Sequence, residues 1–201
     1  MTAPASALQE AAARRRAAAA VIAERCDVLV SACEAIAARF ASRGTLFVFG
    51  SGAAISDAAH VAVEFVHPVI IGKRSLPAVA LSAAAGFGDP VAVFAEQIQL
   101  LARPGDIALG IAGCAPDAAV LAGLRAAAER GLLTIALSGG DGVSEDTTAA
   151  DFALHVPCTD PLVVKEVHVT AYHLLWELVH VYLDRPDVPA LPDLAETALR
   201  R

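Results

Sequence analysis

The stretch TLFVFGSGAAISDAAHVAVEF, residues 45–65, decides how this chain folds. It opens with β-branched and aromatic residues, passes through two glycines and continues with apolar residues at helical spacing. The first part is typical of a buried strand and the last part of a helix with one apolar face. The segment therefore predicts a strand, a tight turn and a helix from Ala53 to Val66.

Four more short apolar runs with turn residues at their ends follow along the chain. They are PAVALS (77–82), DIALGIAG (106–113), LLTIALSGG (132–140) and FALHVP (152–157), and helical stretches separate most of them. Strands that are apolar without interruption are buried on both faces, as in parallel sheets. We expect an α/β fold, a three-layer α/β/α sandwich with a five-stranded parallel sheet, flavodoxin-like, whose ligands bind at the carboxyl ends of the strands.

Helical patterns flank this region on both sides. From about Ser6 to Ala41 apolar residues recur among charged ones without a proline, which predicts one long helix or two in succession. A last helix should run from about Asp160 to Leu183, because the three prolines of DRPDVPALPD (184–193) cannot continue it. We expect one domain with an N-terminal helical region (1–43), an α/β core (44–184) and a C-terminal tail (185–201) that lies on the surface or on a partner subunit.

The composition argues against two classes of partner. There are 15 Lys and Arg against 22 Asp and Glu, so the net charge is −7, and residues 14–16 form the only basic block, which is too small to indicate nucleic-acid binding. Although 56% of the residues are hydrophobic, no apolar run approaches the roughly 18 residues of a membrane span. The four cysteines lack CxxC spacing, which favours reduced thiols and a cytoplasmic location.

Several separate blocks of this sequence resemble one known family. The order and spacing of five blocks resemble those of the SIS (sugar isomerase) domain in phosphoheptose isomerases, over about residues 44–183. The blocks are GSGAAISDAAHVAVEF, PAVALS, GDIALGI, TIALSGGDG and VKEVHVTAYHLL. The resemblance implies a homo-oligomer, a dimer or a tetramer, with active sites between subunits. It also implies aldose–ketose isomerisation of sedoheptulose 7-phosphate or a related sugar phosphate.

The resemblance assigns roles to individual positions. Glu64 matches the family's catalytic base and His173 its catalytic acid, while His60, Glu64 and His173 match ligands of a divalent metal, for which we expect zinc. The substrate-binding residues that we expect are Ser51, Gly52, Asp57, Ser82, Ser138 and Lys165.

Spacing alone leaves these positions open to simpler interpretations. His60 and Glu64 are four residues apart on one predicted helix, which suits one cation but equally a His–Glu hydrogen bond at a subunit contact. Ser138 could contact a ligand or merely turn the chain. On the last helix a polar stripe could be a binding site, the solvated side or an oligomer seam; it comprises Glu166, Thr170, His173, Glu177 and His180.

The loop after the third predicted strand departs from the family. There the resemblance implies a serine- and threonine-rich phosphate loop, but this chain has AGCAPDAA (112–119) without a hydroxyl. Asp117 would repel a phosphate, or it is an ordinary helix N-cap. Lys165 replaces a glutamine of the family; protonated lysine is a poor metal ligand but could pair with an anionic ligand.

Three hypotheses for function follow from the sequence. The first is an aldose–ketose isomerase that uses a Glu/His acid–base pair. The second is a non-catalytic SIS module that binds a ligand or assists a partner protein, since a fold does not fix function. The third is a metal site used for other chemistry, with Glu166 or His168 completing the ligand set for zinc or nickel.

Overall fold

The structure is a computed structural model and describes residues 3–84, 88–142 and 150–185. Helices and strands alternate through most of the described chain, after two helices at its start. In chain order the elements are α1 (Ala3–Glu24), α2 (Cys26–Ala41), β1 (Leu46–Gly50), α3 (Ala54–Val66), β2 (Ala78–Ala80), α4 (Val93–Leu101), β3 (Ile107–Ile111), α5 (Ala118–Glu129), β4 (Leu133–Gly139), β5 (Phe152–Val156) and α7 (Pro161–Leu183). Of the expected C-terminal tail, residues 186–201 lie outside the described residues.

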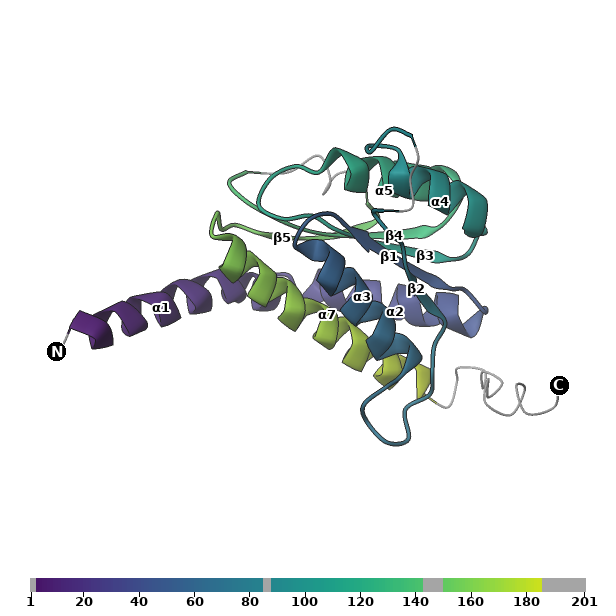
Figure 1. Ribbon diagram of the computed structural model, residues 1–201. Helices are drawn as coiled ribbons and strands as arrows, with labels where there is room; N and C mark the ends of the chain where they lie inside the picture. The colour runs from purple at the N-terminus through teal and green to yellow at the C-terminus, as the bar shows by residue number, and fades with distance from the viewer. Residues whose placement is uncertain (1–2, 85–87, 143–149, 186–201) are drawn as a thin grey trace.

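The five strands form one parallel sheet in the order β2-β1-β3-β4-β5. Helices α4 and α5 cover one face, and α2, α3 and α7 cover the other (Figure 1). The prediction of a three-layer α/β/α sandwich with five parallel strands is therefore confirmed. The strand order reverses between β1 and β3, so the loops that follow these two strands meet at the position where sheets of this type bind ligands.

Alternate side chains of β1 pack into the two hydrophobic cores on opposite faces of the sheet. Val48 packs into the core under α2, α3 and α7, while Phe47 and Phe49 pack into the smaller core under α4 and α5. Each residue of β1 is buried, as expected for a strand that is apolar without interruption. The strand ends at Gly50, where a Cβ atom would lie 2.7 Å from the Ile111 carbonyl oxygen, so only glycine allows β1 and β3 to approach this closely.

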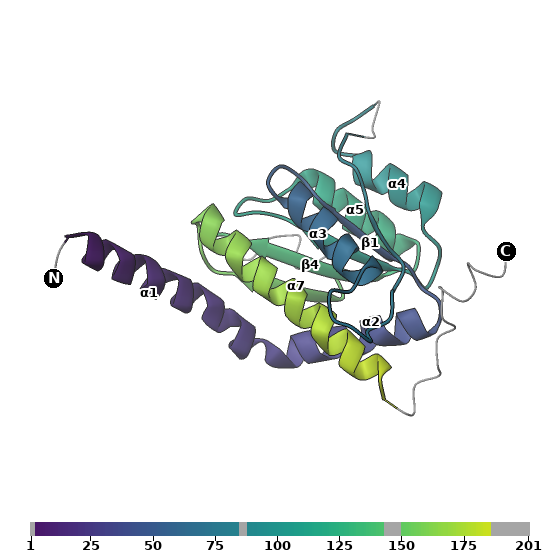
Figure 2. The ribbon, with the colours of Figure 1, turned by 60° about the horizontal axis from the view of Figure 1, so that its bottom comes forward.

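The N-terminal region forms two helices rather than one. Helix α1 extends away from the body of the protein, whereas α2 lies against α7 (Figures 1 and 2). Arg15 attaches α1 to α7, because its guanidinium donates hydrogen bonds of 2.7 and 3.0 Å to both carboxylate oxygens of Glu166. Within the described residues, no helix combines the length and apolarity needed to cross a membrane.

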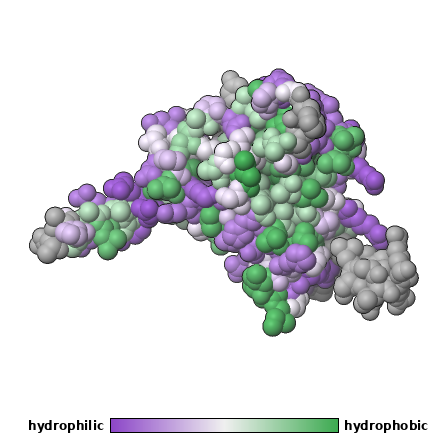
Figure 3. Space-filling model, in the orientation of Figure 1, coloured by the Kyte–Doolittle hydropathy of each residue, from purple (hydrophilic) through white to green (hydrophobic). Residues whose placement is uncertain are grey.

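The loop between α3 and β2 carries an exposed apolar tip. Val69, Ile70 and Ile71 are 77%, 50% and 102% exposed, and Figure 3 shows a hydrophobic projection at this place. A tip of this kind, together with the extended α1, offers apolar surface to another protein chain.

Candidate active site

Three of the side chains singled out by sequence come together between α3 and α7. The ligand atoms of His60, Glu64 and His173 all lie within 4.8 Å of one another. His60 and Glu64 project from one face of α3 because they are four residues apart, and His60 Nε2 lies 3.3 Å from Glu64 Oε1. His173 approaches from α7, with its ring centroid 5.1 Å from that of His60.

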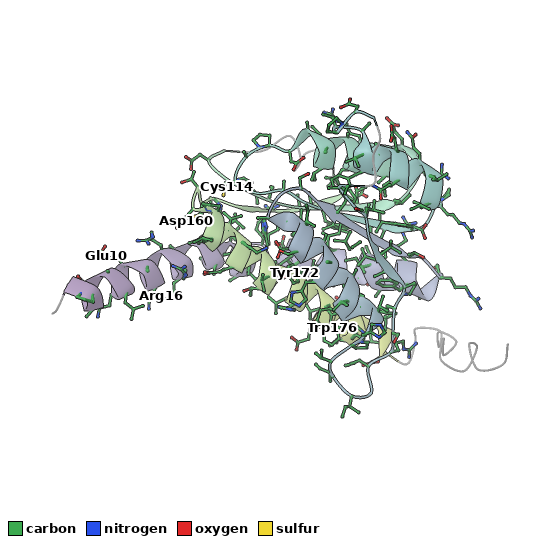
Figure 4. The ribbon with its side chains drawn as sticks, viewed as in Figure 1. Glu10, Arg16, Cys114, Asp160, Tyr172 and Trp176 are labelled. Carbon is green, nitrogen blue, oxygen red and sulfur yellow. The ribbon has the colours of Figure 1, made fainter. Side chains whose placement is uncertain are left out.

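Packing holds Glu64 more firmly than His60. The Glu64 side chain is 13% exposed, against 42% for His60. One turn beyond His173 on α7, Trp176 donates a 2.8 Å hydrogen bond from its indole Nε1 to the Glu64 carbonyl oxygen. Figure 4 shows Trp176 and Tyr172 along the part of α7 that lies beside α3. The backbone of Glu64 is thus fixed to α7, and its carboxylate faces the cluster.

The cluster fits a divalent cation. Two donors that each lie about 2.1 Å from a tetrahedral zinc ion are roughly 3.4 Å apart, which is close to the 3.3 Å between His60 Nε2 and Glu64 Oε1. Two imidazoles and a carboxylate form a nitrogen and oxygen donor set of the kind that zinc accepts with one coordination position open.

Lys165 and Asp57 form an ion pair beside this cluster. The Lys165 ammonium lies 2.5 Å from Asp57 Oδ2 and also donates to the Ala53 carbonyl (3.0 Å) and to Ser56 Oγ (3.1 Å). The Asp57 side chain is 7% exposed and that of Lys165 is 35% exposed. Since all three ammonium donors have partners, Lys165 ties the N-terminal turn of α3 to α7.

The two residues expected at the end of β1 lie in the turn that starts α3. Gly52 has a φ of +55°, a left-handed conformation that glycine adopts readily, and Ser51 precedes it half-buried. Both are at the switch point of the sheet. Ser82 lies elsewhere, in the exposed segment after β2, where its hydroxyl accepts a hydrogen bond from the backbone of Ala84.

Ser138 is buried at the end of β4, with 1% of its surface exposed. Its hydroxyl forms a 3.0 Å hydrogen bond with Nδ1 of His155, whose Nε2 is bonded to the Gly140 carbonyl. This His155 pairing was not predicted, because the two residues lie on neighbouring strands and a single sequence does not give strand order. Since the Ser138 proton is directed to His155, this buried hydroxyl keeps only its capacity to accept.

Asp117 is the N-cap of α5, as one of the two sequence interpretations had it. Its carboxylate accepts hydrogen bonds from the backbone N–H groups of Ala119 (3.0 Å) and Val120 (3.1 Å). In the same loop, burial and the negative charges of Cys158 and Asp160 raise the pKa of the Cys114 thiol. The N-terminus of α5 is thus already occupied by the Asp117 carboxylate.

The polar stripe predicted on the last helix divides into different environments. His180 does not belong to a solvated side: it is 1% exposed, and its ring nitrogens lie 2.8 and 3.2 Å from the Trp176 and Arg74 carbonyl oxygens, because the segment after α3 covers this end of α7. Glu166 pairs with Arg15, and His168 is buried with its Nε2 bonded to the Ser138 carbonyl. Neither of these two joins the cluster, which one of them would have completed in the third hypothesis.

His168 should make stability depend on pH. Burial lowers its pKa, and the hydrogen bond to Ser138 only partly opposes this shift. Below the ordinary histidine pKa of about 6.5, the unfolded chain therefore binds a proton that the folded chain excludes. We expect this residue to reduce the free energy of unfolding by up to about 1.4 kcal/mol per pH unit as pH falls below that value, with no contribution above it.

Urea unfolding between neutral and mildly acidic pH measures this effect. His168→Gln can still donate to the Ser138 carbonyl but cannot take up a proton, so its stability should fall less steeply with acidification. Parallel curves for the two proteins would show that His168 does not carry the dependence.

The chain matches the SIS domain family over residues 11–139. This finding agrees with the parallel sheet, its strand order and the position of the cluster beside the switch point. The fold and the site thus define the class of protein, an SIS-domain protein.

Similar proteins of known name show to which family of SIS-domain proteins the chain belongs. The chain is 37% identical over 186 residues to a phosphoheptose isomerase of Solidesulfovibrio magneticus, covering 89% of each chain, and 32% identical over 159 residues to one of Roseiflexus, covering 76% of this chain and 80% of the relative. Among solved structures, phosphoheptose isomerase GmhA from Neisseria gonorrhoeae superposes with a TM-score of 0.73 at 27% identity, over 89% of this chain and 97% of that one. The chain belongs to the phosphoheptose isomerase family of SIS-domain proteins.

Proposed function

We propose that this sugar-phosphate isomerase interconverts the aldose and ketose forms of a seven-carbon sugar phosphate, sedoheptulose 7-phosphate or a close relative. The observation that carries the proposal is the meeting of Glu64 and His173 from two helices, beside a switch point of the sheet. Its relatives are enzymes named phosphoheptose isomerase, which favours catalysis over a binding or accessory module.

The chemistry needs a proton to move between two neighbouring carbons of the sugar. In the proposed reaction the Glu64 carboxylate removes the proton on the carbon beside the carbonyl, and His173 protonates the oxygen of the resulting enediolate. Glu64 then returns its proton to the adjacent carbon while the neighbouring hydroxyl gives its proton back to His173 and becomes the new carbonyl, so both groups are restored and the reaction needs no external oxidant or reductant. Fixing the Glu64 backbone through Trp176 keeps the carboxylate in position for both transfers.

A divalent metal, zinc by our expectation, would be held by His60, Glu64 and His173. When bound, such an ion stabilises negative charge that develops on a carbonyl oxygen. The 3.3 Å separation of His60 Nε2 and Glu64 Oε1 supports this assignment. Nickel would suit the same donor set.

Asp117 weakens the binding of the substrate phosphate if the phosphate lies at the start of α5, as the family resemblance implies. Asp117→Ser keeps an N-cap but removes the negative charge. We expect the KM for the sugar phosphate to fall roughly fivefold. This corresponds to about 1 kcal/mol for the removed repulsion between one carboxylate and the phosphate, screened by water and salt. The measurement is steady-state kinetics at low ionic strength.

Unphosphorylated sedoheptulose is the control for this prediction. Its binding should not respond to Asp117→Ser, because it carries no charge. An equal change for both sugars would mean that Asp117 acts through the loop conformation and not through repulsion of phosphate.

We further propose a cytoplasmic homo-oligomer, a dimer or a tetramer. The apolar tip at residues 69–71 and the extension of α1 away from the body support self-association. The free thiols among the described residues, Cys26, Cys33, Cys114 and Cys158, support a reducing compartment.

The test of the proposed function is calorimetric titration with sedoheptulose 7-phosphate, with and without zinc, followed by an isomerase assay on the same sample. We expect saturable binding and turnover, with turnover dependent on the metal. If the protein shows no binding and no turnover at millimolar ligand, the proposal is wrong, and an accessory role becomes the favoured hypothesis.

A further inference from the structure

The carbonyl group of Glu64 belongs to the last turn of α3, where carbonyl groups have no donor within the helix. The carbonyls of the residues before and after it accept backbone hydrogen bonds of 2.7 and 2.8 Å from His67 and Leu76. In a longer helix the Glu64 carbonyl would accept from residue 68, but this residue is Pro68, which has no N–H. A continued helix therefore cannot supply a donor to the carbonyl of the proposed base.

Trp176 supplies this donor from α7, which lies beside α3 (Figure 4). Its indole Nε1 donates to the Glu64 carbonyl at 2.8 Å, and the residue is 5% exposed. The buried ring of His180, one turn further along α7, packs against the indole with the ring centroids 4.5 Å apart. A buried indole N–H needs an acceptor, so the bond meets a requirement of both groups.

The helix that carries Trp176 also carries the proposed acid. His173 lies three residues before Trp176 on α7, so the two side chains project from the same side of the helix. On α3, Glu64 has both the carbonyl that Trp176 binds and the carboxylate that belongs to the cluster. One hydrogen bond thus joins the residue that removes the proton to the helix that holds the proton donor.

We propose that Trp176 is a positioning residue for the isomerisation: it holds the last turn of α3 against α7 and thereby sets the position of Glu64 relative to His173. Without this bond the last turn frays more often, because a helix end whose carbonyls lack partners opens locally. The carboxylate then spends less time at the distance that both proton transfers need. The effect on the reaction rests on the proposed function, whereas the effect on the helix end does not.

Two variants remove the indole N–H. Trp176→Phe keeps an aromatic ring, and replacement of the tryptophan by β-(3-benzothienyl)alanine keeps the full shape, with sulfur in place of the N–H. The chain has one tryptophan, so growth on this analogue changes residue 176 alone. The analogue leaves no cavity, which separates the hydrogen bond from the packing of the ring.

The control variant is Thr134→Val, which removes a different hydrogen bond of a buried residue. The Thr134 hydroxyl donates to Asp151 at 2.9 Å, and the residue is 1% exposed. Its side chain is on the same face of β4 as Ala136, which packs into the core under α4 and α5 and not against α3 or α7. The substitution should lower the stability of the protein without acting on the end of α3.

The first test is hydrogen–deuterium exchange of the metal-free proteins, followed by mass spectrometry. We expect the amides of residues 65–67 to exchange about 5- to 30-fold faster in both Trp176 variants, the range expected for one lost hydrogen bond, and to keep their rate in Thr134→Val. An unchanged rate in the benzothienylalanine protein would overturn the proposal. This includes the case in which Trp176→Phe alone exchanges faster, because the size of the ring would then hold the helix end.

The second test is steady-state kinetics with sedoheptulose 7-phosphate at saturating zinc. Both Trp176 variants should lose about 10- to 100-fold in kcat, with KM within about twofold of the wild type, because the displaced carboxylate acts in proton transfer. Thr134→Val should keep its kcat. A wild-type kcat in both Trp176 variants, or an equal loss in Thr134→Val, would refute a positioning role. A wild type without turnover would instead refute the proposed function, and the exchange rates would still decide whether Trp176 holds the helix end.

Discussion

Glu64→Gln should lower kcat by about 10²- to 10⁴-fold, the usual contribution of a positioned general base. The amide cannot accept the proton that the proposed reaction removes, yet it has the size of the carboxylate. The Trp176 hydrogen bond goes to the Glu64 carbonyl and not to its side chain, so the variant should keep its place against α7. Steady-state assays at saturating sugar phosphate measure the effect, because they separate kcat from KM.

Glu177→Gln is the matched control for that variant. Glu177 lies one turn beyond His173 on α7, and its side chain is exposed. The Glu177→Gln variant should retain the kcat of the wild type. Its urea midpoint should equal that of Glu64→Gln. If kcat in Glu64→Gln stays within tenfold of the wild type, another group is the base.

Asp57→Ala should lower the free energy of unfolding by about 3 kcal/mol, near the lower limit for breaking a buried ion pair. The substitution leaves the Lys165 ammonium without its counter-ion while 35% of that side chain reaches solvent, which moderates the loss. Urea unfolding followed by circular dichroism gives the value.

Two comparisons identify the cause of this loss. In Asp57→Ala/Lys165→Met the unpaired charge is gone, so most of the stability should return. Asp184→Ala breaks the pair with Lys73, whose atoms are 2.6 Å apart, but Asp184 is 52% exposed and the loss should stay below about 1 kcal/mol. Equal losses in Asp57→Ala and Asp184→Ala would mean that burial of the Asp57 pair contributes nothing.

The sequence predicted the sheet because its strands are apolar without interruption. β1 and β3 are buried at each position, and the turn after β1 contains the glycines that its geometry requires. The meeting of His60 and Glu64 was also predictable, because it depends only on helical spacing. The approach of His173 followed from family resemblance and not from spacing, since α3 and α7 are far apart in the chain.

The partners of buried polar groups were not predictable from sequence. Lys165 was expected to be available to an anionic ligand, but it pairs with Asp57, 108 residues away. His180 shares the helical spacing of the exposed residues on α7 and is nevertheless covered, because the segment ending at Arg74 folds over it. Such pairings depend on which side chains two elements bring opposite each other. The hydropathy pattern of a sequence does not predict these contacts.

Two helices start near the edge of the sheet where the strands end, and each supplies its own anion. Asp117 caps α5 and Asp160 caps α7, with side-chain oxygens on the backbone N–H groups of the first turn. Free phosphate therefore meets two helix ends, those of α5 and α7, at which backbone N–H groups already have a carboxylate as acceptor. We therefore expect inorganic phosphate to compete only weakly with the sugar phosphate for this protein.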